Sequence, residues 1–471
     1  MKLLLTGATG YIGKRLLPIL VEMGHEVVCC VRDLNRYFPP ESLKEKVIIV
    51  QLDLLNEESL KSIPQDIDVA YYLVHSMSES ASYQELELKC ARNFRKAIEK
   101  TKVQQVIYLS GIINEAILSK HLISRKNVEL ELERGKYPLT ALRAGIIVGS
   151  GSASFEIMRD LVEKLPLMIT PKWLLTRCQP IAIADVITLL SKSILNIDTY
   201  NKDFDIGGPD ILSYKEMLLE FARQRNLKRS IMIVPVMTPR LSSYWLYFVT
   251  STSYKLAVAL VNSMKVDVVC RNNELLQIIS HKPITYKKAL KNAFSKIENN
   301  EIISSWKDAY ASSGMNINIS DFIRVPIFGC FKDRRVHSFE NREECINKIW
   351  RIGGGKGWYY GNWLWRFRGF LDKLFGGVGL RRGRTNIDSL NVGDALDFWR
   401  GLYANKKEGR LLLFAEMKLP GEAWLEFKIE SGNLVQTATF RPLGILGRLY
   451  WISVLPFHGF IFKGMLKKLI S

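Results

Sequence analysis

The first 150 residues alternate short apolar runs with longer stretches in which apolar positions recur at helical spacing. Six of the apolar runs have strand length, at residues 2–5, 26–31, 47–52, 69–74, 106–109 and 140–143. Helical patterns lie between them, and the most regular covers residues 83–100. Strands that alternate with helices are joined by crossovers and run parallel, so this region predicts a Rossmann-like, doubly wound α/β sheet.

From residue 145 to about residue 298 the pattern is mixed. Turns marked by Pro166, Pro171 and Pro180 alternate with apolar stretches at helical spacing, at residues 214–225 and 241–264. We interpret residues 145–298 as insertions that form a substrate region on the same sheet, so that the first domain covers residues 1–298. The polar, asparagine-containing stretch that follows predicts a linker at residues 299–318.

Residues 319–471 have a different composition, because they hold seven of the ten tryptophans. Strand-like runs at 410–418, 423–429 and 434–441 are separated by turn residues and predict an antiparallel meander, and an apolar helix over 446–470 closes the chain. We therefore expect an α+β domain with an antiparallel sheet. By analogy, it matches a helix-grip arrangement (START-like, SRPBCC-like), in which the sheet wraps the last helix around either a cavity for a lipid or quinone-like ligand or a filled core.

The composition, 47% apolar and 24% charged over 471 residues, is that of a globular protein and excludes a disordered or fibrous chain. The seven cysteines form no CxxC pair and the six histidines show no HxxxH or HExxH spacing, so no metal site is predicted. Scattered thiols favour a reducing compartment, and no basic-then-apolar leader precedes the first strand. We expect a cytoplasmic protein.

The formal net charge is +19, and much of it lies near the end of the chain, where residues 311–471 include 25 basic and 14 acidic side chains. Such a field attracts phosphates, anionic lipid or nucleic acid. The aromatic-basic stretch at 363–368 lacks the pattern of an RNA-recognition or zinc motif, so no nucleic-acid partner is expected.

Two charge-free runs, at 241–254 and 449–462, bear on membrane contact. Each has 14 residues, whereas a spanning helix needs about 20 apolar residues. The second run is followed by Lys463, Lys467 and Lys468, a pattern typical of a helix at the lipid interface. The alternatives are peripheral contact with the inner face of a membrane and burial within the domain.

The strongest chemical signal is the segment TGATGYIG, which lies between the first strand and the first helix. Its glycines permit a tight turn, a close approach of backbone amides to a pyrophosphate, and close packing of helix on strand. The N-terminus of the helix then faces the anion. Cofactor contacts in this segment are expected from Gly7, Thr9, Gly10, Tyr11, Ile12 and Gly13.

Residues at the ends of the following strands bear on which dinucleotide binds. Arg32, after the second strand, favours the 2′-phosphate of NADPH, although Asp33 beside it leaves NADH open. Asp53, after the third strand, is placed to meet the adenine amine. The other residues expected along the dinucleotide follow the third, fourth and sixth strands: Leu54, Leu73, Val74, His75, Gly145 and Ile146.

Three sequence motifs, the glycine-rich segment and two further ones, together indicate a family resemblance. TGATGYIG, the segment YLSG at 108–111 and the segment LRAGIIVG at 142–149 resemble an atypical short-chain dehydrogenase/reductase of the NmrA-like kind. Nearly the whole chain, with its tryptophan-rich end, is similar to the bacterial YbjT-like proteins. The resemblance implies an NAD(P)-binding domain fused to a C-terminal domain of unknown function.

The resemblance also implies a catalytic serine and a tyrosine–lysine pair four residues apart. Ser110 matches the serine, but the frame that matches the pair, HLISRKNVE, has His121 for tyrosine and Arg125 for lysine. Histidine can donate a proton near neutral pH, whereas arginine does not deprotonate. Two hypotheses follow: an NADPH-dependent oxidoreductase for a hydrophobic carbonyl or quinone-like substrate, which we favour, and a non-catalytic dinucleotide sensor or assembly protein whose last domain binds a lipid or a partner.

Overall fold

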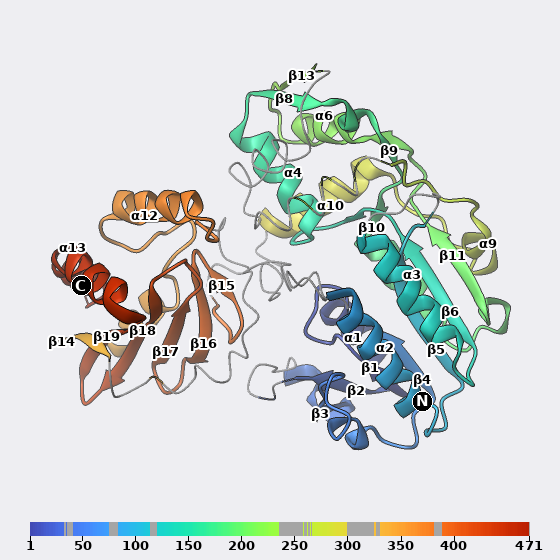
Figure 1. The fold of residues 1–471 in the computed structure, drawn as a ribbon, viewed down its shortest axis with the longest axis horizontal. Helices are drawn as coiled ribbons and strands as arrows, with labels where there is room; N and C mark the ends of the chain where they lie inside the picture. Colours follow the sequence, from blue (N-terminus) through green and yellow to red (C-terminus); the bar gives the residue numbers. More distant parts are fainter. Residues whose placement is uncertain are drawn as a thin grey trace. The chain divides into compact units, whose positions relative to one another are not determined.

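The computed structural model describes two compact units of the chain (Figure 1). One holds the described residues up to 298 and the other holds those from 325 onward. The described residues are 1–32, 34, 41–74, 83–113, 120–234, 258, 261, 264, 266–298, 325, 330–380 and 389–470. The linker predicted at 299–318 lies outside them.

The first unit is built on a seven-stranded parallel sheet with the order β11-β6-β5-β4-β1-β2-β3. Its strands are β1 (Lys2–Leu5), β2 (Glu26–Val31), β3 (Val47–Gln51), β4 (Val69–Tyr72), β5 (Gln105–Gly111), β6 (Leu139–Ala144) and β11 (Lys202–Ile206). The parallel sheet predicted from the sequence is confirmed. Sequence analysis missed β11, an edge strand in which charged residues alternate with apolar ones.

Helices cover both faces of this sheet (Figure 1). One face carries α1 (Gly13–Glu22), α5 (Ile183–Lys192) and α9 (Glu274–Ile278), and the other carries α2 (Tyr83–Ile98) and α3 (Lys120–Glu133). Because successive residues of a strand point to opposite faces, each strand supplies apolar side chains to both layers. The strand order reverses between β1 and β4, which is where doubly wound sheets bind ligands, outside the carboxyl ends of the strands.

The rest of the first unit forms a smaller, mainly helical layer with its own apolar core. Its helices are α4 (Ala153–Lys164), α6 (Tyr214–Gln224) and α10 (Tyr286–Glu298). Its short paired strands are β7 (Ile147–Val148) with β10 (Ile181–Ala182), β8 (Leu167–Pro171) with β13 (Ser230–Val234), and β9 (Arg177–Cys178) with β12 (Leu212–Ser213). Short segments of 3-10 helix lie at Glu41–Lys46, Ser59–Ser62, Lys172–Leu175 and Ile197–Thr199. Most of the helix predicted over 241–264 lies outside the described residues.

The second unit contains a six-stranded antiparallel sheet with the order β14-β19-β18-β17-β16-β15. Its strands are β14 (Phe331–Ser338), β15 (Ala395–Leu396), β16 (Trp399–Asn405), β17 (Arg410–Ala415), β18 (Gly421–Glu430) and β19 (Asn433–Pro442). The predicted meander is confirmed as β17, β18 and β19. Sequence analysis missed the strands on either side of it. One of them, β14, alternates exposed and partly buried residues and carries five charged or histidine side chains.

Three helices belong to this unit: α11 (Arg342–Ile349), α12 (Asn362–Leu374) and α13 (Gly444–Ile470). They share one core with the sheet, in which Trp358 stacks on Trp365 with ring centroids 4.7 Å apart. Among the described residues, α13 is the one helix that is long and apolar enough to cross a membrane by length and composition, and only 17% of its most apolar stretch is buried. The 14-residue run counted from the sequence therefore understates this helix, which continues through Arg448 and Lys463.

Candidate functional site

The turn between β1 and α1 forms a cradle that is closed by backbone. Gly7 has a φ of +72°, and a Cβ there would lie 2.8 Å from the Leu73 carbonyl oxygen. At Gly13 a Cβ would overlap the Gly7 carbonyl oxygen and lie 2.8 Å from the Ala8 Cα. The amide of Gly10 donates to the Gly7 carbonyl oxygen at 2.9 Å. At Gly7 and Gly13 the chain therefore folds back on itself too closely for a side chain, whereas Gly10 has only the Gly7 carbonyl oxygen nearby, 3.1 Å from a Cβ.

The first turn of α1 begins directly after this cradle, and in it the amides of Lys14 and Arg15 donate to the carbonyl oxygens of Gly10 and Ile12 at 3.1 and 3.0 Å. Among the described residues, no side chain caps the helix at Ile12, and the first turn contains no acidic residue. Thr9 is exposed in the turn, and Ile12 packs against the core of the sheet face. An uncapped helix N-terminus carries partial positive charge and free donors, which is the arrangement that binds a phosphate group.

Arg15 connects the cradle to a second glycine-containing loop. Its guanidinium donates to the Tyr11 carbonyl oxygen at 3.1 Å and to the Ser150 carbonyl oxygen at 2.9 Å, and it lies 3.9 Å from the centroid of the Tyr11 ring. The Tyr11 hydroxyl lies against Gly149, where a Cβ would approach it to 2.6 Å. Burial raises the pKa of Tyr11 to about 12. Tyr11 therefore stays neutral and holds the loop after β6 rather than presenting its hydroxyl to solvent.

The ends of β2 and β3 carry the residues predicted to choose the dinucleotide. Arg32 is exposed, and its carbonyl oxygen accepts from the Gln51 side chain at 3.2 Å. The Asp53 carboxylate accepts from the Leu55 amide at 3.0 Å, so it already stabilises a turn. Leu54 is buried, and Asp33 lies outside the described residues.

The segments after β4 and β6 complete this edge of the sheet. β4 ends at Tyr72, so Leu73 and Val74, predicted within the strand, lie just beyond it. The Leu73 amide donates to the Thr6 hydroxyl at 3.2 Å, which ties this segment to the cradle. Gly145 and Ile146 follow β6, and the Ile146 carbonyl oxygen accepts from Ile181 at 2.9 Å. His75 lies outside the described residues.

Ser110 and Arg125 both lie near the carboxyl end of β5. The Ser110 hydroxyl is buried near the Tyr108 hydroxyl, two residues earlier on the same face of β5, and makes no well-formed hydrogen bond among the described residues. Arg125, on α3, donates from its terminal nitrogen to the Leu109 carbonyl oxygen at 3.1 Å, while its buried Nε finds no partner within the same part of the chain. Unpaired buried donors are costly, so these two groups are suited to a ligand that would satisfy them.

The position of α3 is fixed by contacts that the sequence did not reveal. The Tyr108 hydroxyl donates to the Arg125 carbonyl oxygen at 3.4 Å, and buried Glu129 forms an ion pair with Arg143 on β6. Burial raises the pKa of Glu129 above its ordinary value, and Arg143 opposes that change. His121 lies in α3 one turn before Arg125, which places both on the same side of the helix, although the described structure does not include the His121 side chain.

The predicted residues come together because every strand that carries them is parallel. The carboxyl ends of β1 to β6 meet at one edge of the sheet, where the cradle, Arg32, Leu73, Ser110 and Gly145 all lie. A cradle too tight for side chains, an uncapped helix and two unpaired buried donors fit a dinucleotide. Sequence reasoning missed Arg15, whose position four residues after Tyr11 in the first turn of the helix was the available signal.

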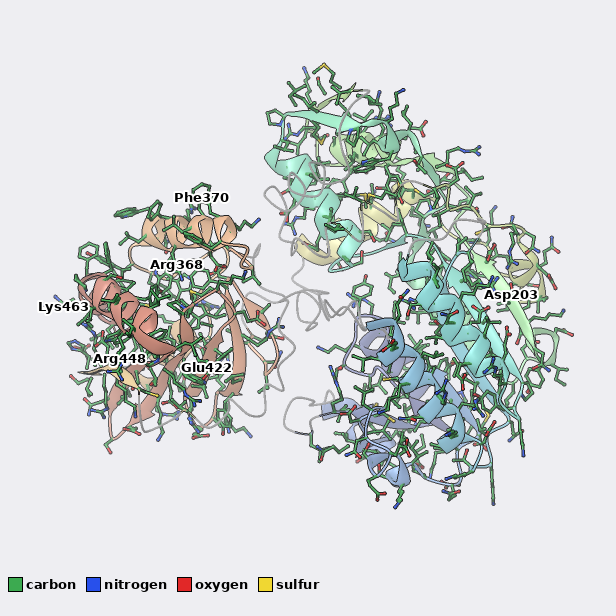
Figure 2. The ribbon with its side chains drawn as sticks, viewed as in Figure 1. Asp203, Arg368, Phe370, Glu422, Arg448 and Lys463 are labelled. Carbon is green, nitrogen blue, oxygen red and sulfur yellow. The ribbon has the colours of Figure 1, made fainter. Side chains whose placement is uncertain are left out.

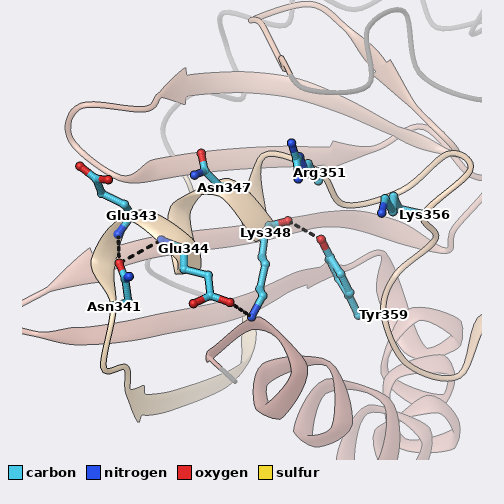
Figure 3. Close-up of a pocket in the computed structure, with 8 residues that line it drawn as sticks. All are labelled: Asn341, Glu343, Glu344, Asn347, Lys348, Arg351, Lys356 and Tyr359. Carbon is cyan, nitrogen blue, oxygen red and sulfur yellow. Dashed lines mark hydrogen bonds and ion pairs between the residues drawn. The ribbon is translucent and has the colours of Figure 1, made fainter.

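A polar depression of about 460 Å³ lies in the second unit, beside α11 (Figure 3). Its polar groups pair locally: Lys348 forms an ion pair with Glu344 at 2.8 Å, Tyr359 donates to the Lys348 carbonyl oxygen at 3.1 Å, and Asn341 caps α11. The other residues around it are Glu343, Asn347, Arg351 and Lys356. This depression is therefore a hydrogen-bonded surface feature without the apolar lining of a typical ligand pocket. Across the described residues, no three potential ligand side chains cluster as a metal site.

Comparison with known families assigns a class to each unit. Residues 7–134 match the family model described as NAD(P)H-binding, and residues 330–465 match a family described as a protein of unknown function, DUF2867. The first unit thus contains an NAD(P)H-binding domain. The resemblance to NmrA-like atypical reductases with a C-terminal domain of unknown function is confirmed at this level.

Two curated proteins are similar in sequence. The mitochondrial NADH-ubiquinone oxidoreductase 40 kDa subunit of Neurospora crassa is 22% identical over 236 residues, which is 49% of this chain and 61% of that protein. The auxiliary protein GraX of Staphylococcus aureus is 29% identical over 157 residues, which is 29% of this chain and 49% of that protein. The chain therefore spans less than two thirds of the length of either relative.

Two solved structures share the fold of the first unit. A triphenylmethane reductase from Citrobacter sp. superposes with a TM-score of 0.51 at 15% identity, over 63% of this chain and 100% of that one. The epimerase Mth375 of Methanothermobacter thermautotrophicus superposes with a TM-score of 0.50 at 14% identity, over 64% of this chain and 94% of that one. At such low identity the likeness concerns the fold alone.

Proposed function

We propose that this protein is an NADPH-dependent oxidoreductase for a hydrophobic carbonyl or quinone-like substrate. The observation that carries the proposal is the cradle of Gly7, Gly10 and Gly13 in front of the uncapped α1, at the point where the strand order reverses. That geometry supports a bound pyrophosphate. The family match supports the dinucleotide, while NADPH and the substrate class are our inference from Arg32 and from the apolar character of residues 145–298.

The residues beyond the cradle have separate roles in this proposal. NADPH supplies the hydride. Ser110, with its buried hydroxyl, donates a hydrogen bond to the substrate oxygen as negative charge develops there. Arg125 is held by the Leu109 carbonyl, stays protonated, and donates to the ribose. His121, one turn earlier on α3, donates the proton that completes the reduced product.

Transfer of isotope from NADPH labelled in its transferable hydride tests these roles. We expect label to enter quinones or apolar ketones, and Ser110→Ala to reduce the rate about 100-fold, because such donors contribute about 10²–10³ to turnover. His121→Gln should lower the rate and remove its dependence on pH near neutrality. Lys126→Met is the matched control, because Lys126 is an exposed cation on the same helix. Unchanged label transfer in the Ser110 and His121 variants would remove both assigned roles.

Arg32→Ala should change the choice of dinucleotide. A charge-assisted bond to the 2′-phosphate contributes about 1.5–3 kcal/mol, so we expect NADPH to bind about 10- to 100-fold more weakly. Affinity for NADH should change by less than about twofold, since NADH lacks that phosphate. Isothermal titration calorimetry with both cofactors measures the ratio of the two affinities. The control is Lys46→Ala, because Lys46 is another exposed cation and directly precedes β3. An equal loss for both cofactors would show that Arg32 acts on general affinity and not on selection.

A second candidate function is a dinucleotide sensor without turnover. It is favoured by the replacement of the expected lysine by Arg125, whose terminal nitrogen is already bonded to the Leu109 carbonyl oxygen. This alternative predicts tight NADPH binding, no oxidation of NADPH across a broad panel of quinones and ketones, and a change in partner or membrane affinity when NADPH binds. Measured hydride transfer to any member of the panel decides against it.

A further inference from the structure

Helix α12 turns large apolar side chains outward. Trp363, Phe367, Phe370 and Leu374 are 52–67% exposed, and Phe375, just after the helix, is 73% exposed. The four helical positions are spaced by four, three and four residues, so they lie along one face. The opposite face buries Trp365 in the core. This helix therefore has a core-facing side and a second apolar side that stays largely exposed among the described residues.

Helix α13 shows the same feature over its first two thirds. Its exposed apolar residues, with the residue just before the helix, are Leu443, Ile445, Leu446, Leu449, Ile452, Leu455, Phe457 and Phe460. Each of these side chains is 45–76% exposed. Single exposed apolar residues are common on proteins, but contiguous groups of this size mark interaction surfaces.

The two helices are neighbours that run in opposite directions. Trp365 of α12 and Phe462 of α13 have ring centroids 6.4 Å apart, and the Arg368 guanidinium lies 5.8 Å from the Tyr450 ring centroid. The C-terminal end of α12 and the N-terminal end of α13 both contact the segment before β18. There, Asp372 accepts from the Lys418 amide, and the Leu443 amide donates to the Pro420 carbonyl oxygen. The exposed apolar faces thus lie on two helices that pack on the same core, and we call their outward residues together the platform: the outward residues of α12, Phe375 and the outward residues of α13.

The charges on the two helices are of one sign. Figure 2 labels Arg368, Arg448 and Lys463 on them, together with the apolar Phe370. The full set of basic residues is Arg366, Arg368, Lys373, Arg448, Lys463, Lys467 and Lys468. The single acidic residue, Asp372, is buried and accepts from the Gly379 and Lys418 amides. No acidic residue follows Glu430 in the sequence. The charged residues that α12 and α13 place outside the core are therefore all basic.

We propose that the platform docks on the surface of an anionic lipid bilayer, with α12 and α13 lying in the interface. Aromatic and aliphatic side chains enter the headgroup–acyl boundary, and the basic side chains pair with anionic headgroups. A second copy fits less well, because its platform would bring basic side chains together. Residues 1–310 also carry more basic than acidic residues, 41 against 33, and so offer no complementary charge overall.

The contacts made by the inner face of α13 indicate whether this helix lies on the bilayer or crosses it. Trp451 stacks on Phe440 of the sheet with ring centroids 5.7 Å apart, and Met465, Leu466 and Leu469 are fully buried in the shared core. A spanning helix would have to leave these contacts and expose the core of the sheet. Docking in the interface keeps them, so only the outward face meets lipid.

Flotation of the full chain with vesicles tests the proposal. We expect the protein to float with vesicles of phosphatidylglycerol and phosphatidylcholine, to float weakly with phosphatidylcholine alone, and to lose part of its binding as salt is raised. Hydrogen exchange on the unaltered chain gives a second measurement, because vesicles should protect residues 362–375 and 444–460 selectively.

Paired substitutions separate the apolar and the charged contributions. Trp363→Ser with Phe370→Ser, and separately Leu449→Ser with Ile452→Ser, should each weaken vesicle binding by about tenfold or more. Ile197→Ser with Ile211→Ser is the matched control, since both are exposed apolar residues of the first unit. Lys463→Gln with Lys467→Gln should weaken binding to anionic vesicles by about tenfold or more at low salt, against the exposed control pair Lys172→Gln and Lys192→Gln.

Three outcomes overturn the proposal. The first is no binding to anionic vesicles, or equal binding by the platform variants and their controls. The second is a dimer in light scattering that the platform substitutions convert to a monomer, which would assign the surface to a second copy. The third is resistance to extraction by alkaline carbonate, which would show that α13 crosses the bilayer.

Discussion

Gly10→Val is expected to lower the affinity for NADPH by about 100-fold or more. A pyrophosphate held by two or more amides gains about 1.5–3 kcal/mol from each charge-assisted hydrogen bond, and a branched side chain keeps the phosphates away from those amides. The strain on the fold should be smaller than at Gly13, because a Cβ at Gly10 meets a single neighbouring atom within 4 Å, the Gly7 carbonyl oxygen at 3.1 Å. Calorimetry gives the affinity, and a thermal melt shows that the protein remains folded.

Gly13→Val provides the contrast, because its Cβ would overlap backbone of Gly7. It should unfold the first unit at a lower temperature as well as abolish binding. Gly355→Val is the control, since a Cβ there has no neighbour within 4 Å, and it should alter neither property. If Gly10→Val binds NADPH as tightly as the unaltered protein, the cradle does not hold the pyrophosphate and the proposed function fails with it.

The parts of the fold that the sequence predicted are those with local causes. The first 31 residues contain β1, the cradle, α1 and β2. In this segment the apolar runs, the glycine spacing and the helical periodicity all reflect contacts between residues that are close in sequence. The meander of β17, β18 and β19 has the same property, since each turn joins strands adjacent in the sheet. In these two segments, where the contacts are close in sequence, local pattern and final structure agree.

The parts that the sequence did not predict depend on distant partners. β11 pairs with β6 across about sixty residues, and its alternating charges make it resemble a loop when it is considered alone. The β8 and β13 pair is equally distant in sequence. Arg15 bonds to Ser150 across 135 residues. No periodicity within a short window contains information about such contacts, which form only when the whole sheet assembles.

The candidate site shows the same division. The glycines, Ser110 and Arg125 could be named from motifs, and the parallel sheet brings them to one edge. Motifs did not reveal that Arg125 is anchored by the Leu109 carbonyl, or that Asp53 already serves a local turn. Residue type and spacing therefore predict where chemistry is located, whereas hydrogen-bond partners decide what each side chain remains free to do.

Arg400→Met is expected to cost the second unit about 3–5 kcal/mol of stability. Arg400 is fully buried, donates to Glu416 at 2.8 Å and to the Gly393 carbonyl oxygen at 2.8 Å, and joins β16 to the residue after β17. Removing one partner of a buried ion pair leaves an uncompensated charge in the core. The free energy of unfolding in urea measures the cost, and tryptophan fluorescence reports mainly on this unit because it holds seven of the ten tryptophans.

The same sheet supplies a matched control. Arg410 and Glu426 are also sixteen residues apart on adjacent strands and also 2.8 Å from each other, but their side chains are 30% and 22% exposed. Because water screens partly exposed charges, Arg410→Met should cost at most about 1 kcal/mol. Arg400→Met combined with Glu416→Leu should recover much of the loss, since two apolar side chains leave no buried charge. Equal costs for the two arginine substitutions would contradict the assignment of burial as the cause.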